Sequence, residues 1–198
     1  MIVKNMVVEP TTLLGKSVRL EPLRIEHVGP LAHVGLDPSL WRWIPNPVAS
    51  ADDMRTYVQT ALDEQKKGDS VPFAIVDLIS GQVIGSTRYA NIEPAHRRLE
   101  IGWTWLTPSF QRTPANTEAK LLLLTHAFEK LGANRVELKT DALNDRSREA
   151  ILRIGAVEEG TFRKHMIMAT GRVRDTVYFS IIASEWPAIK AKLRAFLG

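Results

Sequence analysis

A short polar segment, residues 111–117, has the residue types that bind phosphate. It lies between a predicted strand at 98–106 and a predicted helix at 116–131, and a further strand is predicted at 135–140. A strand, a helix and a second strand in one sheet make parallel neighbours, and the helix then begins beyond the end of the first strand. Backbone N–H groups at a helix N-terminus attract anions, and Arg112 adds a positive charge. The segment therefore predicts a phosphate site, although a crossover helix that binds nothing shows the same pattern.

The rest of the chain supplies the elements that must hold this unit. Apolar spacing and capping residues predict further helices at 27–36, from Ser50 to Gly68, at 145–154 and after Ser184. Runs rich in β-formers predict further strands at 17–23, 73–79, 82–92, 162–168 and 176–182. No linker is long or polar enough to divide the chain. We expect a tail at 1–12 and one α+β domain at 13–198.

The composition excludes several classes of protein. The 198 residues are 44% hydrophobic and 24% charged, which is an ordinary globular balance and not that of a disordered chain. Because there is no cysteine, disulfides, cysteine-ligated zinc and a thiol nucleophile are excluded. The five histidines are scattered, so no metal site is expected. No run of about 18 apolar residues and no secretory signal is recognisable, so we expect a cytoplasmic protein without membrane contact.

The formal net charge of +4 is only a weak indication of anionic partners. The chain has no block of consecutive basic residues, and no strand alternates aromatic with basic residues. Nucleic-acid binding is therefore not expected.

Several motifs occur together in a fixed order. They are Leu99-Glu100-Ile101-Gly102-Trp103-Thr104-Trp105-Leu106, Gln111-Arg112-Thr113-Pro114-Ala115-Asn116-Thr117-Glu118-Ala119, Leu131-Gly132, Arg135-Val136-Glu137-Leu138, Asn144 with Arg146-Ser147, and Gly155 with Glu159-Gly160. In order and spacing they resemble the GNAT superfamily of N-acetyltransferases, and within it the ribosomal-protein-alanine acetyltransferase-like (RimJ/RimL-like) branch. The resemblance covers roughly residues 11–196 and depends on the whole set, since no single motif is specific.

The resemblance implies an α+β fold of the three-layer α/β kind. Its GNAT-like mixed sheet would have six or seven strands, helices on both faces, and a splay between strands 98–106 and 135–140. Acetyl-CoA would lie in this splay as the cosubstrate, with its pyrophosphate on the helix N-terminus and its pantetheine arm along freed strand backbone. The implied binding residues are Trp103, Thr104, Trp105, Gln111, Arg112, Thr113, Ala115, Asn116, Thr117 and Asn144.

Two departures from the family pattern stand out. The family's loop usually reads Gln/Arg-x-x-Gly-x-Gly/Ala, whereas this chain has Pro114 and Asn116 at the glycine positions. Pro114 has no N–H to offer a phosphate, while Asn116 could act as the helix N-cap. The second departure is Ile151, at the position where many members carry the tyrosine that protonates the departing thiolate.

Two residues are candidates for proton transfer. Glu100 would lie on the strand that leads to the thioester and could act as general base for the acceptor amine, through water. Its alternative is a half-buried carboxylate paired with Arg97 or Arg98. Ser147 could serve the thiolate in place of the absent tyrosine, since this helix faces the CoA sulfur in relatives. Ser147 and Asn144 could equally only cap their helix.

The acceptor site is the least defined part of the sequence. His165 precedes a turn that borders the acceptor pocket in relatives, and Trp41 and Trp43 could form a wall of that pocket. A solvated edge and core packing, respectively, are the alternatives. The last third of the chain is locally basic, which could suit the CoA 3′-phosphate or an acidic acceptor.

Together, these features predict an N-acetyltransferase that moves the acetyl group of acetyl-CoA to an amine by direct attack in a ternary complex. The amine would be a protein N-terminus or a small molecule, and a homodimer is left open. The alternative is a catalytically weak acyl-CoA-binding module with a regulatory role, suggested by Pro114 and by the missing tyrosine.

Overall fold

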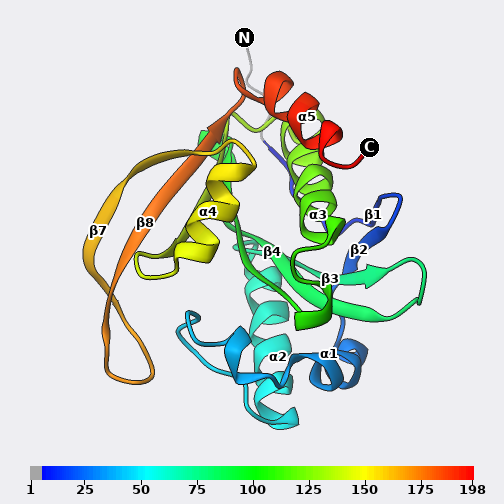
Figure 1. Cartoon of the computed structure of the whole chain (residues 1–198), viewed down its shortest axis with the longest axis vertical. Coiled ribbons are helices and arrows are strands. Elements are labelled where there is room, and N and C mark those ends of the chain that lie inside the picture. Colours follow the sequence, from blue (N-terminus) through cyan, green and yellow to red (C-terminus); the bar gives the residue numbers. More distant parts are fainter. Residues whose placement is uncertain (1–5) are drawn as a thin grey trace.

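The computed structural model describes residues 6–198, and an eight-stranded sheet forms its centre (Figure 1). The strands are β1 (Leu13–Leu14), β2 (Val18–Pro22), β3 (Val71–Asp77), β4 (Val83–Glu93), β5 (Arg98–Leu106), β6 (Arg135–Asp141), β7 (Val157–Ile167) and β8 (Val173–Ile182). Their order is β1-β2-β3-β4-β5-β6-β8-β7, with β5 and β6 parallel and the other neighbours antiparallel. The predicted mixed sheet is confirmed. The sheet has one strand more than the upper value of the predicted six or seven, because two-residue β1 is too short to show alternation.

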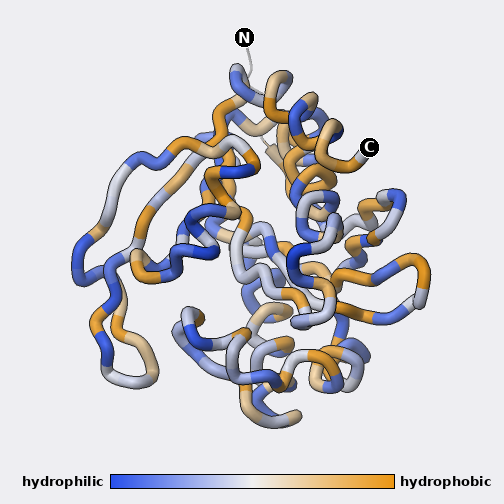
Figure 2. Tube along the Cα trace, in the orientation of Figure 1, coloured by the Kyte–Doolittle hydropathy of each residue, from blue (hydrophilic) through white to orange (hydrophobic). Residues whose placement is uncertain are grey.

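Helices cover both faces of the sheet, as predicted. The helices α1 (Val28–Gly35) and α2 (Ala51–Lys67) cover one face, and the helices α3 (Pro114–Thr125), α4 (Asp145–Arg153) and α5 (Trp186–Ala195) cover the other. A cluster of buried apolar side chains lies under each set. Figure 2 shows α4 as hydrophilic at its start and hydrophobic toward its end, where it joins the core. Within the part of the chain that the structure describes, no helix is both long and apolar enough to cross a membrane.

The ends of two helices test the capping predictions. The Ser50 hydroxyl accepts a hydrogen bond from the Asp53 N–H at 3.1 Å, and Gly68 ends α2 with φ +84°. Both match the prediction, since glycine adopts this left-handed conformation without strain. The prediction that Ser184 caps the last helix is wrong. Glu185 precedes α5, and its carboxylate instead accepts from the N–H of Ile182.

The helix that follows β5 begins two residues earlier than predicted. Thr113 is its N-cap, and the Thr113 hydroxyl accepts from the N–H of Ala115 at 3.3 Å. Asn116 is therefore not the cap. Pro114 occupies the first helical position, where the missing N–H breaks no helical bond, so the fold tolerates this departure from the family pattern.

The end of the same helix also differs from the prediction, because α3 stops at Thr125 and a π-helical turn, His126–Lys130, follows. The hydroxyl of buried Tyr89 donates to the carbonyl of Leu123 at 2.6 Å, just before this turn. A side chain that bonds a helix carbonyl in this way favours a local change of helix type.

The predicted splay is present between β5 and β6. The two strands pair only at Arg98 with Arg135, Leu99 with Val136 and Glu100 with Glu137. Beyond these pairs β5 continues to Leu106 and β6 to Asp141, but the two strands no longer pair with each other. The separation leaves strand backbone on both sides without a neighbour, which is the condition for a ligand to enter the sheet.

The final hairpin is longer than predicted. Strands were predicted at 162–168 and 176–182, whereas β7 and β8 begin at Val157 and Val173. Most of β7 is exposed at the edge of the sheet, so its sequence carries no alternation that would have marked its start.

Candidate functional site

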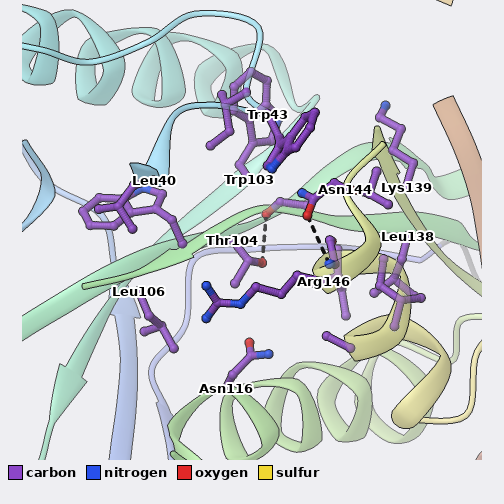
Figure 3. Close-up of a pocket in the computed structure, with 18 of the residues that line it drawn as sticks. Leu40, Trp43, Trp103, Thr104, Leu106, Asn116, Leu138, Lys139, Asn144 and Arg146 are labelled. Atoms are coloured by element: carbon purple, nitrogen blue, oxygen red, sulfur yellow. Dashed lines mark hydrogen bonds between the residues drawn. The ribbon is translucent and has the colours of Figure 1, made fainter. Parts of the chain in front are cut away.

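A cavity of about 630 Å³ occupies the splay between β5 and β6. Figure 3 shows its walls: β5, the first turn of α3, the start of α4, and the loop that carries Leu40 and Trp43. The predicted site residues that line it are Trp43, Glu100, Trp103, Thr104, Trp105, Gln111, Arg112, Thr113, Asn116, Asn144 and Ser147. Residues from four separate stretches of the chain thus meet at the predicted place.

Four predicted site residues do not line the cavity. Trp41 is 3% exposed and packs on Tyr57 and Trp105 in the core under α2, so the core-packing alternative holds for it. His165 is exposed on β7, against Phe162 and Tyr178. Ala115 is buried in the core, and Thr117 is buried with its hydroxyl accepting a hydrogen bond from Arg153. Their backbone still forms the first turn of the helix beside the cavity.

β5 is irregular where it borders the cavity. Ser86 pairs with Trp105 and Arg88 pairs with Gly102, so one residue of β4 faces two of β5, which defines a β-bulge. Trp103, inside the bulge, has φ +53°, which is rare for a bulky residue. Its ring lies 4.6 Å from the buried guanidinium of Arg88, and the Arg88 guanidinium also faces Tyr57 at 4.8 Å. This cation–π contact holds Trp103 in a strained conformation at the cavity wall.

Positive charge collects at the α3 end of the cavity. The side chains of Arg112, Lys120, Arg146 and Arg153 line this end, and Glu149 is the acidic side chain among them. Arg153 donates to the Thr117 hydroxyl at 2.7 Å, which places its guanidinium at the first turn of α3. Together with the helix N-terminus, these groups give this end of the cavity the chemistry that favours an anion.

Lys120 is unusual among these cations because it is 6% exposed. Its ammonium donates to the Thr104 hydroxyl at 2.7 Å, and the Thr104 hydroxyl lies 2.8 Å from that of Thr87. Burial disfavours the charged form and lowers the pKa of Lys120 to about 7. An anion bound beside it would favour the charged form of Lys120.

Asn116 provides a hydrogen-bonding group for the centre of the cavity. Its side-chain oxygen is buried and has no hydrogen-bond partner within residues 6–198. Figure 3 shows the amide pointing from α3 into the cavity, below Thr104. Buried polar atoms are normally paired, so this oxygen fits a ligand that brings an N–H or O–H donor.

Glu100 lies at the point where β5 and β6 separate, and it is 2% exposed. Its Oε2 accepts from the Asn91 amide at 2.7 Å and pairs with the Lys139 ammonium at 2.8 Å. The predicted alternative partners were wrong: Arg97 donates to the Gly132 carbonyl, and Arg98 faces Glu137. Side chains alternate along a strand, so Lys139 shares the face of Glu137, the parallel partner of Glu100.

The other oxygen of Glu100 has no such partner. Oε1 makes no hydrogen bond to the described residues, and it lies only 2.6 Å from where a Cβ on Gly102 would be. A glycine at 102 therefore makes room for this oxygen. Because Glu100 lines the cavity, Oε1 is the atom through which it can accept a proton.

The start of α4 brings two further predicted residues to the cavity. The side-chain oxygen of Asn144 accepts from the N–H of Ser147 at 3.2 Å, so Asn144 does cap this helix (Figure 3). Asn144 caps the helix and also lines the cavity, as Ser147 does. Ile151 lines it too, so the position of the missing tyrosine does face the site.

The sequence reasoning missed Lys139, Lys120 and Asn91. A lysine in the middle of an apolar helix is a usable signal for Lys120, whereas the other two depend on strand register. No group of three His, Cys, Asp or Glu side chains that could hold a metal ion occurs among residues 6–198.

Known proteins share this architecture. The family model of the acetyltransferase (GNAT) domain matches residues 17–157. This chain belongs to the GNAT acetyltransferase family. It is 31% identical over 176 residues to YdaF of Bacillus subtilis strain 168, a candidate ribosomal N-acetyltransferase, and the match covers 86% of this chain and 92% of that protein. The predicted family, including its likeness to the ribosomal-protein branch, is confirmed.

Solved structures of GNAT acetyltransferases have the same fold as this chain. A GCN5-related N-acetyltransferase from Brucella melitensis has a TM-score of 0.89 and 36% identity, with 96% of this chain and 87% of that chain covered. RimJ of Mycobacterium smegmatis, solved with CoA-disulfide, has a TM-score of 0.80 and 24% identity, with 94% of each chain covered. The chain is thus an N-acetyltransferase of a family that uses acetyl-CoA.

Proposed function

We propose that this acetyltransferase moves the acetyl group of acetyl-CoA to an amine, on a protein N-terminus or a small molecule, by direct attack in a ternary complex. The observation that carries the proposal is the position of Glu100, which lines the cavity where the sheet splays and has one carboxylate oxygen without a hydrogen-bond partner among the described residues. An amine must lose a proton before or during attack, and a positioned carboxylate can accept it, directly or through water.

The cavity suits acetyl-CoA as the cosubstrate. The phosphates match the α3 N-terminus with Arg112, Arg146 and Arg153, because charge-assisted hydrogen bonds to phosphate are strong. The unpaired oxygen of Asn116 matches an amide N–H or hydroxyl of the pantetheine arm. The fold likeness to a RimJ that was solved with CoA-disulfide supports binding of a CoA compound.

The departing thiolate needs a proton, and we assign this role to the Ser147 hydroxyl. Ser147 lies in the first turn of α4, whose N–H groups favour negative charge nearby. Ile151, one helical turn further along the same cavity wall, has no proton to give.

Glu100→Gln tests the proposal, because it keeps the side-chain shape and removes the base. With a responsive amine, kcat/KM should fall by roughly 10²–10⁴ near neutral pH, and the loss should shrink at high pH, where the amine is already neutral. Glu137→Gln is the matched control, since Glu137 shares the face of Glu100 but pairs with Arg135 outside the cavity. Ser147→Ala should lower kcat while leaving acetyl-CoA affinity nearly unchanged. A pH–rate profile of unaltered shape in Glu100→Gln would exclude Glu100 as the base.

A second candidate function is acyl-CoA binding without turnover, in a regulatory module. Ile151 in the place of the tyrosine is the observation that favours it. The two functions separate in one assay: thiol release with any amine supports the enzyme, and calorimetric binding of acetyl-CoA without release supports the module.

A further inference from the structure

Arg174 is a buried guanidinium that the proposed reaction does not use. It lies on β8, is 6% exposed, and lines the cavity together with Trp43 and Met166. Its Nε donates to the Thr176 hydroxyl at 3.1 Å and its Nη1 to the carbonyl of Trp43 at 3.2 Å. Its remaining amino group makes no hydrogen bond to the described residues, and it is not among the buried unpaired atoms. Arg174 therefore has one amino group free to bind a ligand in the cavity that it lines.

Strand register places Arg174 on the same side of the sheet as Glu100. Tyr178 of β8 pairs with Lys139 of β6, and Thr176 pairs with Asp141. Side chains two residues apart on a strand share a face, so Arg174 joins Lys139 on the face that holds the Glu100 carboxylate. Glu100 and Arg174 also line the same cavity.

The carboxylates on this face are already neutralised. Asp141 is 1% exposed and forms a close ion pair with Arg172, and its Oδ2 lies 3.9 Å from Nε of Arg174. Glu100 is paired with Lys139. Near Arg174, the cations Arg172, Arg174 and Lys139 therefore face the carboxylates Asp141 and Glu100. Glu137, further along the same face, is already paired with Arg98 and Arg135. The surplus positive charge is presented by the open amino group of Arg174. A guanidinium keeps its charge at neutral pH even when burial lowers its pKa, as it does for Arg174.

We propose that the acceptor is an amine that carries its own carboxylate a few atoms away, as a free α-amino acid does. This inference rests on the proposed function. The amine would lie at Oε1 of Glu100 and the carboxylate on Arg174, beneath the loop that carries Trp43. A guanidinium recognises a carboxylate through parallel N–H donors. A polycationic amine would meet the surplus positive charge with no free carboxylate to receive it.

The test compares a panel of α-amino acids with their carboxamides, in a thiol-release assay with acetyl-CoA. At least one amino acid should exceed its amide by roughly 10- to 100-fold in kcat/KM, the size of a lost hydrogen bond to a charged group. The amine beside an amide is less basic, so a larger share is neutral, and this works against the expected preference. Amides or polyamines that react as well as the acids would overturn the inference, and would point to a peptide N-terminus or a polyamine instead.

Variants of Arg174 test whether this residue causes the preference for the amino acid over its amide. Arg174→Gln should abolish the discrimination against the amide, with the loss of kcat/KM falling mainly on the amino acid, and Arg174→Lys should keep part of the discrimination. Arg148→Gln is the matched control, because Arg148 pairs with Glu158 away from the cavity. A preference that survives in Arg174→Gln would overturn the assignment of Arg174. No thiol release with any amine would defeat the proposed function itself, and the inference with it.

Discussion

At the scale of single residues, the sharpest prediction concerns Lys120, the buried lysine of α3. The pKa of Lys120 is about 7 in the folded protein, against about 10.4 for a lysine in an unfolded chain. Below pH 7 Lys120 is charged in both states, and the folded state then bears the full cost of burying the charge. Above about pH 10 it is neutral in both states and the cost disappears. Stability should therefore rise through this range.

We expect Lys120→Met to be more stable than the natural protein at pH 6, by a few kcal/mol, because it removes a buried charge. The difference should shrink steadily as the pH rises toward 10. Urea unfolding at pH 6, 8 and 10 measures this, with Lys67→Met as the control at an exposed position of α2. A difference that is the same at all three pH values would contradict a buried, titrating Lys120.

The same residue links stability to binding. An anion bound beside Lys120 would raise its pKa, so the cost of the buried charge would be offset only when the cavity is filled. A residue that costs stability when the site is empty is common at functional sites. Gly102 is also explained by the cavity, because a side chain at this position would collide with the Glu100 oxygen.

At the scale of elements, one carboxylate fixes α3 to the first strands. Glu118, 5% exposed, accepts hydrogen bonds from the N–H groups of Lys16, at 2.6 Å, Ser17, at 2.8 Å, and Val18, at 2.9 Å, and from the Ser17 hydroxyl. Burial pushes the pKa of Glu118 up, but the hydrogen bonds from Ser17, Lys16 and Val18 outweigh it, so that the pKa is lowered. The start of α3, which borders the cavity, is thereby held against the β1–β2 turn.

Glu118→Gln should lower the free energy of unfolding by about 2–4 kcal/mol near neutral pH, because an amide nitrogen cannot accept these bonds and leaves buried N–H groups unpaired. A lowered pKa stabilises the fold above the ordinary glutamate pKa and is lost as the pH falls through the folded value. The difference between the two proteins should therefore shrink in acid. Glu9→Gln, at an exposed position, is the control. An effect below about 0.5 kcal/mol at pH 7 would show that α3 is held by packing alone.

At the scale of the whole molecule, ligand binding should be visible as stabilisation. A ligand at 100 times its Kd stabilises a protein by about 2.7 kcal/mol. The cations Arg112, Arg146 and Arg153 are exposed, so their attraction for phosphate is screened by salt. We expect acetyl-CoA to raise the Tm, and to raise it less in 0.5 M salt than at low ionic strength.

Thermal unfolding with acetyl-CoA, and with S-acetylpantetheine as a control without phosphates, measures this effect. The control should show a smaller shift with little salt dependence. Equal shifts for both compounds would mean that the α3 end of the cavity does not bind the phosphates. No shift with either compound would argue against acetyl-CoA binding in this cavity.

The features that were predictable from the sequence are those encoded by neighbouring residues. The strand–loop–helix–strand unit around residues 98–140 and the Ser50 and Gly68 ends of α2 each depend on local spacing and on residues with specific backbone preferences. Their conformations are favoured before any tertiary contact forms. The family follows from the same local motifs taken in order, so the general chemistry was accessible without the structure.

The specific pairings were decided by tertiary structure alone. Trp41 and Trp43 are two residues apart, yet one fills the core and the other lines the cavity. Lys139 pairs with Glu100, and Arg174 shares their face, because the register of β5, β6 and β8 aligns distant parts of the chain. Strand register depends on which faces the whole sheet buries, and no local segment encodes it. The arrangement of these charged groups is therefore a property of the folded sheet.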